Sequence, residues 1–116
     1  WRAFSLYIRK KDMDSKGFVE CYTCGIKKFY RNMDAGYGIS GRSNSVLFLE
    51  AVIRPQCQQC NRFKHGELHI FTRKIIEELG IKRYDLLVKL SNEVVKYSIS
   101  DYEEITEDYK MRLGLI

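Results

Sequence analysis

The sequence lacks any apolar run long enough to cross a bilayer. Its 116 residues contain no stretch of about 18 consecutive apolar residues, and no secretory signal is visible. It also lacks internal repeats and low-complexity segments. The chain starts with Trp1 and not with methionine, so we expect a fragment or a processed chain. These absences exclude a membrane-spanning protein and leave one globular domain as the expectation for this length.

Cysteine is confined to four positions, Cys21, Cys24, Cys57 and Cys60. They form two Cys-x-x-Cys pairs separated by the segment 25–56. Each pair can direct two thiolates to one point, so the spacing predicts a single tetrahedral Zn²⁺ site. Four sulfur ligands leave no open position, which makes this zinc structural. Two disulfides or a redox-active pair are the alternatives, but no thioredoxin-like βαβ pattern supports the second.

Acidic residues are scarce in the first two thirds of the chain. The net charge is +5, and residues 1–76 carry 14 Lys and Arg against 6 Asp and Glu. Residues 77–116 reverse the balance, with 6 against 9. A basic front with an acidic rear indicates that the front faces a polyanion such as nucleic acid. A solvated surface that happens to be basic is the alternative.

Hydrophobic spacing predicts a helix at each end and short strands near the first cysteine pair. We expect a helix over 1–10, strands over 17–21 and 27–31, and an irregular segment over 33–45. Residues 46–52 are predicted as a strand or a short helical turn. Further helices are predicted over 61–79, with Gly80 as its C-terminal cap, over 84–96, and from Ser100, where Ser100 and Glu103 fit a capping box.

A second metal site is predicted beside the cysteines. Asp34 lies in the segment that the zinc would brace, and Asn61 directly follows Cys60. If 61–65 is helical, Asn61 and His65 share one face a single turn apart. Together with Asp34 they could hold a divalent ion with open positions for phosphate and water. His69 is too far along the helix to join them and is expected to be a surface or packing residue.

Several runs of the sequence together resemble the phage NinG/Rap recombination proteins. The runs are 17–25 (GFVECYTCG), 33–36 (MDAG) and 55–63 (PQCQQCNRF), with 4–9 (FSLYIR) at the start and a closing helix through Tyr109 and Lys110. This family is similar in layout to phage endonuclease VII. The resemblance covers most of the chain, and the combination of motifs is much more specific than any one of them.

The resemblance implies an α+β fold, with a zinc-stapled ββα-metal (HNH-like) core followed by a C-terminal helical extension. We place the nucleic-acid-binding or nuclease core at residues 1–80. The extension, residues 81–116, is expected to pack on the core or to serve self-association. Asp34 and Asn61 match the family's catalytic metal ligands, and His65 stands where other HNH nucleases have a further ligand.

The family motif continues with a histidine as general base, and here that position is Tyr37. An unperturbed tyrosine has a pKa of about 10, so it is a poor base at neutral pH. Val52 and Arg54 also replace the residues usual in the family, Asn and His. Three positions of the family's nuclease motif, 37, 52 and 54, therefore carry residues that differ from the expected ones.

Three functions follow as hypotheses. The first is an Mg²⁺- or Mn²⁺-dependent endonuclease for Holliday junctions or other branched DNA, in which four basic residues clamp the backbone: Arg42, Arg54, Arg62 and Lys64. The second is a catalytically silent DNA-binding or protein-interaction module. The third is a zinc ribbon of a larger machine, which leaves the Asp34 and Asn61 pairing unexplained. For the first two we expect the cytoplasm of an infected host cell, near the nucleoid, a possible homodimer and phage recombination proteins as partners.

Overall fold

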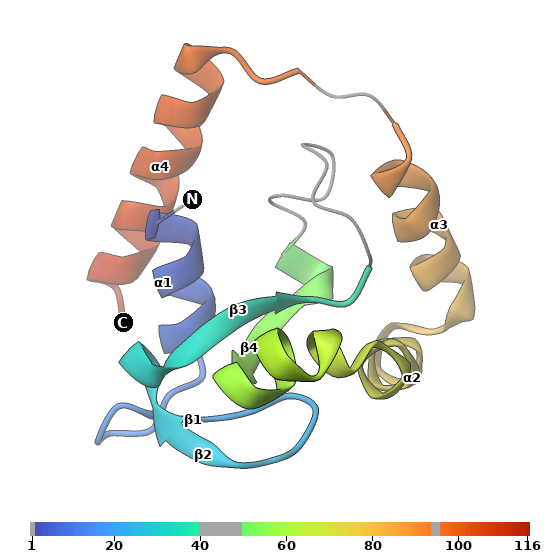
Figure 1. The fold of residues 1–116 in the computed structure, drawn as a ribbon. Coiled ribbons are helices and arrows are strands. Elements are labelled where there is room, and N and C mark those ends of the chain that lie inside the picture. The colour runs from blue at the N-terminus through green and yellow to red at the C-terminus, as the bar shows by residue number, and fades with distance from the viewer. Residues whose placement is uncertain (1, 40–49, 94–95) are drawn as a thin grey trace.

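Two small antiparallel sheets adjoin two groups of helices (Figure 1). The computed structural model describes residues 2–39, 50–93 and 96–116. Helix α1 is Arg2–Lys10, β1 (Phe18–Glu20) pairs with β2 (Lys27–Phe29), and β3 (Met33–Tyr37) pairs with β4 (Ile53–Cys57). The later helices are α2 (Leu68–Leu79), α3 (Ile81–Ser91) and α4 (Ile99–Gly114). Strand β3 crosses between the α1/α4 pair and the α2/α3 pair, and the β1–β2 sheet lies at the bottom of the view (Figure 1). This mixture of helices and small sheets confirms the expected α+β class.

The hairpin of β3 and β4 corrects the expectation of an irregular segment from residue 33. Residues 33–37 form a strand in which Asp34 pairs with Gln56 and Gly36 with Arg54. Gly36 is required here because a Cβ atom would lie only 2.0 Å from Oε1 of Gln56. Pro55 is tolerated because the sheet has two strands and every strand is an edge. Gly36 and Pro55 lower the strand propensity of these two segments, so the sequence did not predict the pair. The pair forms because of packing between the two segments.

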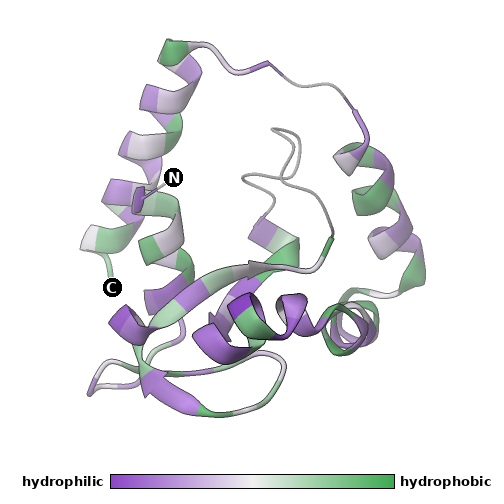
Figure 2. Ribbon diagram, in the orientation of Figure 1, coloured by the Kyte–Doolittle hydropathy of each residue, from purple (hydrophilic) through white to green (hydrophobic). Residues whose placement is uncertain are grey.

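The main core joins both ends of the chain. Phe4 and Ile8 of α1 are buried with Phe71 and Ile75 of α2. Helix α4 returns to this core, because the ring of Tyr109 meets the ring of Phe4 edge-on at 4.7 Å between centroids. Figure 2 shows polar and apolar segments alternating along α4, as expected for a helix that packs on one side.

The C-terminal helices begin earlier than predicted. Gly80 has φ 86° and its amide donates to Ile76, so it ends α2 as expected. Helix α3 then starts at residue 81 and ends at 91, not at 96. The capping box is formed by Ser98 and Asp101, whose side chains bind each other's backbone amides, and not by Ser100 and Glu103. The two patterns overlap in sequence, and spacing alone does not distinguish them.

A second, smaller core lies around the cysteines. Val19 and Met33 are buried with Cys21, Cys57 and Cys60. This cluster supports the two hairpins that carry the cysteine pairs. In the described ranges, no helix combines the length and apolar character that crossing a membrane requires.

Candidate metal centre and adjoining pocket

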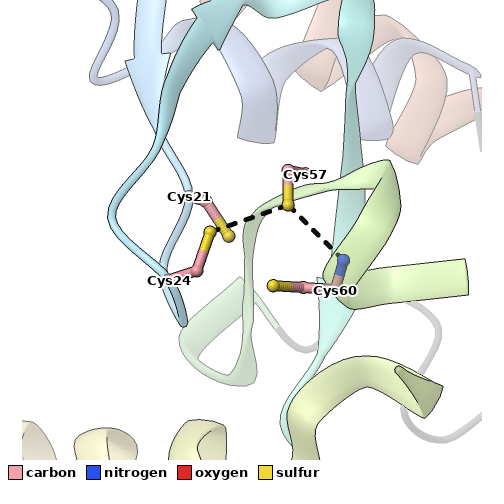
Figure 3. Close-up of side chains that lie close together, drawn as sticks. All are labelled: Cys21, Cys24, Cys57 and Cys60. Carbon is pink, nitrogen blue, oxygen red and sulfur yellow. Dashed lines mark hydrogen bonds between the residues drawn. The ribbon is translucent and has the colours of Figure 1, made fainter. Parts of the chain in front are cut away.

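The four cysteine thiols converge on one point (Figure 3). Cys21 and Cys24 lie in the turn between β1 and β2, which Gly25 closes with φ 81°. Its amide donates to the Cys21 carbonyl at 3.0 Å. Cys57 ends β4, and Cys60 lies in the helical segment that follows. The Tyr22 amide binds the Pro55 carbonyl at 2.9 Å, which ties the first pair to β4.

The spacing of the sulfur atoms fits a tetrahedral metal. All four Sγ atoms lie within 4.8 Å of one another, and those of Cys24 and Cys57 are 3.7 Å apart. Zinc–sulfur bonds of about 2.3 Å in a tetrahedron place neighbouring sulfurs about 3.8 Å apart. The backbone amide of Cys60 also points at Sγ of Cys57, at 3.4 Å. Four cysteines in this arrangement could bind a structural metal such as zinc.

The thiols differ in how readily they ionise. Burial raises the pKa of Cys21, but hydrogen bonds from the Thr23 hydroxyl and nearby backbone amides outweigh it and lower the pKa to about 6. Burial raises the pKa of Cys60 to about 12 and also raises that of Cys24. A metal that binds here must therefore displace protons, and its affinity should fall as the solution becomes acidic.

Asp34 and Asn61 meet beside this cluster. Nδ2 of Asn61 donates to Oδ2 of Asp34 at 3.0 Å. Arg62 adds a two-pronged ion pair, with Nε 2.9 Å from Oδ2 and Nη2 3.0 Å from Oδ1. The Asp34 hydrogen bond and its charge raise the pKa of Arg62. Two residues that the sequence predicted as partners are thus neighbours, and Arg62 binds the same carboxylate.

The backbone that places His65 beside this site differs from the continuous helix that the sequence predicted. Residues 59–63 form a π-helical turn, closed by the Lys64 amide on the Gln59 carbonyl at 3.0 Å. His65 and Gly66 then take φ values of 52° and 81°, so the helix is broken between Asn61 and the following turn. The expectation that Asn61 and His65 share one continuous helical face is wrong. Both nevertheless line the same pocket.

The pocket has a volume of about 740 Å³ and opens beside Asp34. Helix α1, strand β3, the π-helical turn and the 65–66 turn all contribute to it. The polar and charged residues of its lining, Tyr37 included, are Ser5, Arg9, Arg31, Asp34, Tyr37, Gln58, Asn61, Arg62 and His65. Tyr37 is half-buried in β3 opposite Ile53. His69 is exposed on α2 and does not belong to this lining.

The basic residues expected to clamp DNA are scattered. Arg62 binds Asp34, and Lys64 lies 4.0 Å from Glu67 at the exposed surface. Arg54 donates to the Glu50 and Ile53 carbonyls and lies near Glu78, away from the pocket lining. Arg42 lies outside the described residues. Val52, which replaces an asparagine of the family pattern, is fully buried in the main core.

A buried glutamine connects the cysteine cluster to the pocket. Nε2 of Gln56 donates to the Thr23 hydroxyl at 3.0 Å and to the Gly66 carbonyl at 2.7 Å. The Thr23 hydroxyl is in turn 3.5 Å from Sγ of Cys21. No sequence motif indicates this link, and none marks Ser5, Arg9 or Arg31 as residues of the site. Only the i, i+4 spacing of Ser5 and Arg9 hinted that they share a face.

Comparisons with known proteins identify a family for this chain. The profile of the family described as "Bacteriophage Lambda NinG protein" matches residues 1–116. The chain is 26% identical over 113 residues to Protein ninG of Salmonella phage P22, which covers 97% of this chain and 53% of that protein. The identity to Protein ninG of Escherichia phage lambda is also 26%, over 97% of this chain and 52% of the relative.

The chain spans about half the length of these curated relatives. No solved structure matches it. Because the family profile covers the whole chain, the chain belongs to the family of bacteriophage lambda NinG proteins.

Proposed function

We propose that this chain is an HNH-type endonuclease domain that cuts branched DNA, such as Holliday junctions, during phage recombination. The observation that carries the proposal is the meeting of Asp34 and Asn61 at 3.0 Å in a pocket beside four clustered cysteines. A β-hairpin followed by a helical turn delivers these two side chains to one place. Zinc held by the cysteines would fix that hairpin, and its role would be structural.

The second ion would be Mg²⁺ or Mn²⁺. Asp34, Asn61 and His65 offer the oxygen and nitrogen ligands that suit such ions. When bound, the ion would polarise the phosphate and stabilise the leaving oxygen. An amide offers a metal its oxygen, whereas Nδ2 of Asn61 faces Asp34 here. Binding through the Asn61 oxygen therefore requires the amide to turn over, and Arg62 competes with the metal for the Asp34 carboxylate.

Arg62 would then be free to bind DNA. Its guanidinium presents the paired N–H groups that fit a phosphate as well as a carboxylate. Lys64, exposed on the same stretch of chain, would add a second backbone contact. Tyr37 stands at the position of the expected base, where a phenol assists poorly. Loss of a general base typically costs about 10²–10⁴ in rate, so slow cleavage is compatible with this site.

The second candidate is a DNA-binding module that no longer cuts. Two observations favour it: Tyr37 occupies the base position, and Arg62 holds both oxygens of Asp34. In this reading the cysteine-braced hairpins recognise DNA structure or dock other phage recombination proteins. A homodimer would match the two-fold symmetry of a junction under either reading, and the cytoplasm of the infected host cell is the proposed site of action.

A cleavage assay separates the two candidates. Zinc-loaded protein is incubated with a labelled four-way junction and a matched duplex, with Mg²⁺, with Mn²⁺ or without either ion. The variants are Asp34→Ala and Tyr37→His, with Asp85→Ala on the exposed surface of α3 as the matched control.

Metal-dependent nicking that Asp34→Ala abolishes and Asp85→Ala retains would support the nuclease. Junction binding without cutting, and cutting gained in Tyr37→His, would support the silent module. If no variant binds or cuts either DNA, the nuclease and the DNA-binding module both fail, and docking of other phage recombination proteins is the reading that remains.

A further inference from the structure

Two arginines in the pocket have no carboxylate partner among the residues that the structure describes. Arg9, Arg31 and Arg62 face a single acidic lining residue, Asp34, and Arg62 already binds it. Within the described ranges, neither Arg9 nor Arg31 forms an ion pair. A pocket that keeps two uncompensated guanidinium groups is suited to an anion.

Arg9 is held in place by the backbone. Its Nε donates to the Ser5 carbonyl and its Nη1 to the Tyr30 carbonyl, each at 3.2 Å. These bonds use two of the five N–H groups of a guanidinium, and the described residues accept from none of the others. Burial lowers the pKa of Arg9, and the nearby Asp34 charge opposes that effect. A partly buried guanidinium whose remaining donors face a pocket is suited to bind an anionic ligand.

Arg31 and Ser5 extend the same wall. The guanidinium carbon of Arg31 lies 5.9 Å from the centre of the Tyr30 ring, and the backbone carbonyl of the same tyrosine accepts a hydrogen bond from Arg9. Ser5 precedes Arg9 by one turn of α1 and also lines the pocket. Two guanidinium forks and a hydroxyl are typical ligands of a phosphate.

We propose that Ser5, Arg9 and Arg31 form a phosphodiester-binding subsite that holds a DNA backbone phosphate beside the Asp34–Asn61 pair. This inference rests on the proposed function for the identity of the anion. Helix α1 and the turn before β3 build the subsite, and it works without the second divalent ion. Its task is to set the register of the DNA, so that another phosphate of the strand reaches Asp34 and Asn61.

Binding measured without Mg²⁺ or Mn²⁺ tests the subsite. Fluorescence anisotropy of a labelled junction and duplex is recorded at several NaCl concentrations with the zinc-loaded protein. The variants are Arg9→Gln and Arg31→Gln, with Arg83→Gln, the same charge change on the exposed surface of α3, as control. The affinity for inorganic pyrophosphate is measured in parallel by calorimetry.

Each pocket variant should weaken DNA binding about tenfold. Each should also reduce the slope of log affinity against log salt by about 0.9, the value for one lost phosphate contact. Arg83→Gln should change neither quantity. If Arg9→Gln unfolds, Arg31→Gln still tests the subsite, because Arg31 is exposed and, among the described residues, makes no hydrogen bond or ion pair that the fold would lose.

The outcomes separate the subsite from the proposed function. If the wild type binds DNA but both pocket variants keep its affinity and slope, the subsite is wrong and the DNA function stands. If pyrophosphate binds in an Arg31-dependent way while DNA does not, the subsite stands and the DNA function fails. If the wild type binds neither ligand, the subsite is overturned.

Discussion

Replacing Gln56 by glutamate should destabilise the protein far more than replacing it by methionine. Gln56 is fully buried, and its Nε2 donates to Thr23 and Gly66. Its Oε1 has no hydrogen-bond partner among the described residues and lies against Gly36. Glutamate has the same shape but would bring a carboxylate into a site without a neutralising charge. Methionine removes the polar atoms and keeps similar bulk.

The magnitudes follow from the groups involved. Methionine loses two hydrogen bonds worth about 1 kcal/mol each, partly offset because no unpaired buried oxygen remains. A carboxyl at position 56 must be protonated to donate to the Gly66 carbonyl, and the Thr23 hydroxyl can then turn and donate to it. With an ordinary pKa of about 4.3, holding it neutral at pH 7 costs about 4 kcal/mol.

The pH dependence has a definite sign. The folded-state pKa of the introduced carboxyl lies above its unfolded value, so the Gln56→Glu variant is nearest to wild type in acid. It should lose about 1.4 kcal/mol relative to wild type for each pH unit up to the folded-state pKa. Urea unfolding of the zinc-loaded proteins at pH 6, 7 and 8, followed by circular dichroism, measures this difference. A constant difference across these pH values, or a methionine variant less stable than the glutamate variant, would refute the reasoning.

Three further predictions concern the metals and the surface. Chelating the metal of the four cysteines should abolish the circular dichroism signal of the two hairpins, and Zn²⁺ but not Mg²⁺ should restore it. Arg62→Ala should tighten Mn²⁺ binding, because the ion pair with Asp34 no longer competes with the metal, and an unchanged affinity in calorimetry would show that the pair is irrelevant. The hydrogen bond from Tyr22 lowers the pKa of Glu78, so its contribution exists above the unfolded pKa and is lost as the pH falls. Glu78→Gln should therefore flatten the acid side of the stability curve slightly, and an unchanged curve would contradict this.

The sequence predicted those parts of the fold that depend on interactions between residues close together in the chain. The apolar spacing of Phe4 and Ile8 placed α1 and its buried face, and Gly80 marked the end of α2. The two Cys-x-x-Cys pairs indicated a shared metal site, and the four thiols do converge. In each case the signal and its cause lie within a few residues of one another.

The parts that sequence could not predict depend on contacts between distant segments. Strand β3 forms although Gly36 disfavours it, because the Gln56 side chain fills the space beside that glycine. The break at His65 is held by a hydrogen bond from Gln56 to the Gly66 carbonyl, ten residues away in sequence. Arg9 lines the pocket, and its position depends on a hydrogen bond that its Nη1 donates to the carbonyl of Tyr30, which belongs to another element. The spacing of hydrophobic residues along the chain gives no information about such contacts between distant segments.

These contacts between distant segments connect the cysteine cluster to the pocket. Thr23 is 3.5 Å from Sγ of Cys21, and Gln56 connects Thr23 to Gly66, next to His65. The Tyr22 amide on the Pro55 carbonyl adds a second tie between the first cysteine pair and β4. Loss of the metal would release Thr23 and with it the donor that fixes the 65–66 turn. A metal bound by the four cysteines would therefore act on the pocket without touching any residue of its lining, because the chain of contacts through Thr23 and Gln56 ends at Gly66, next to His65.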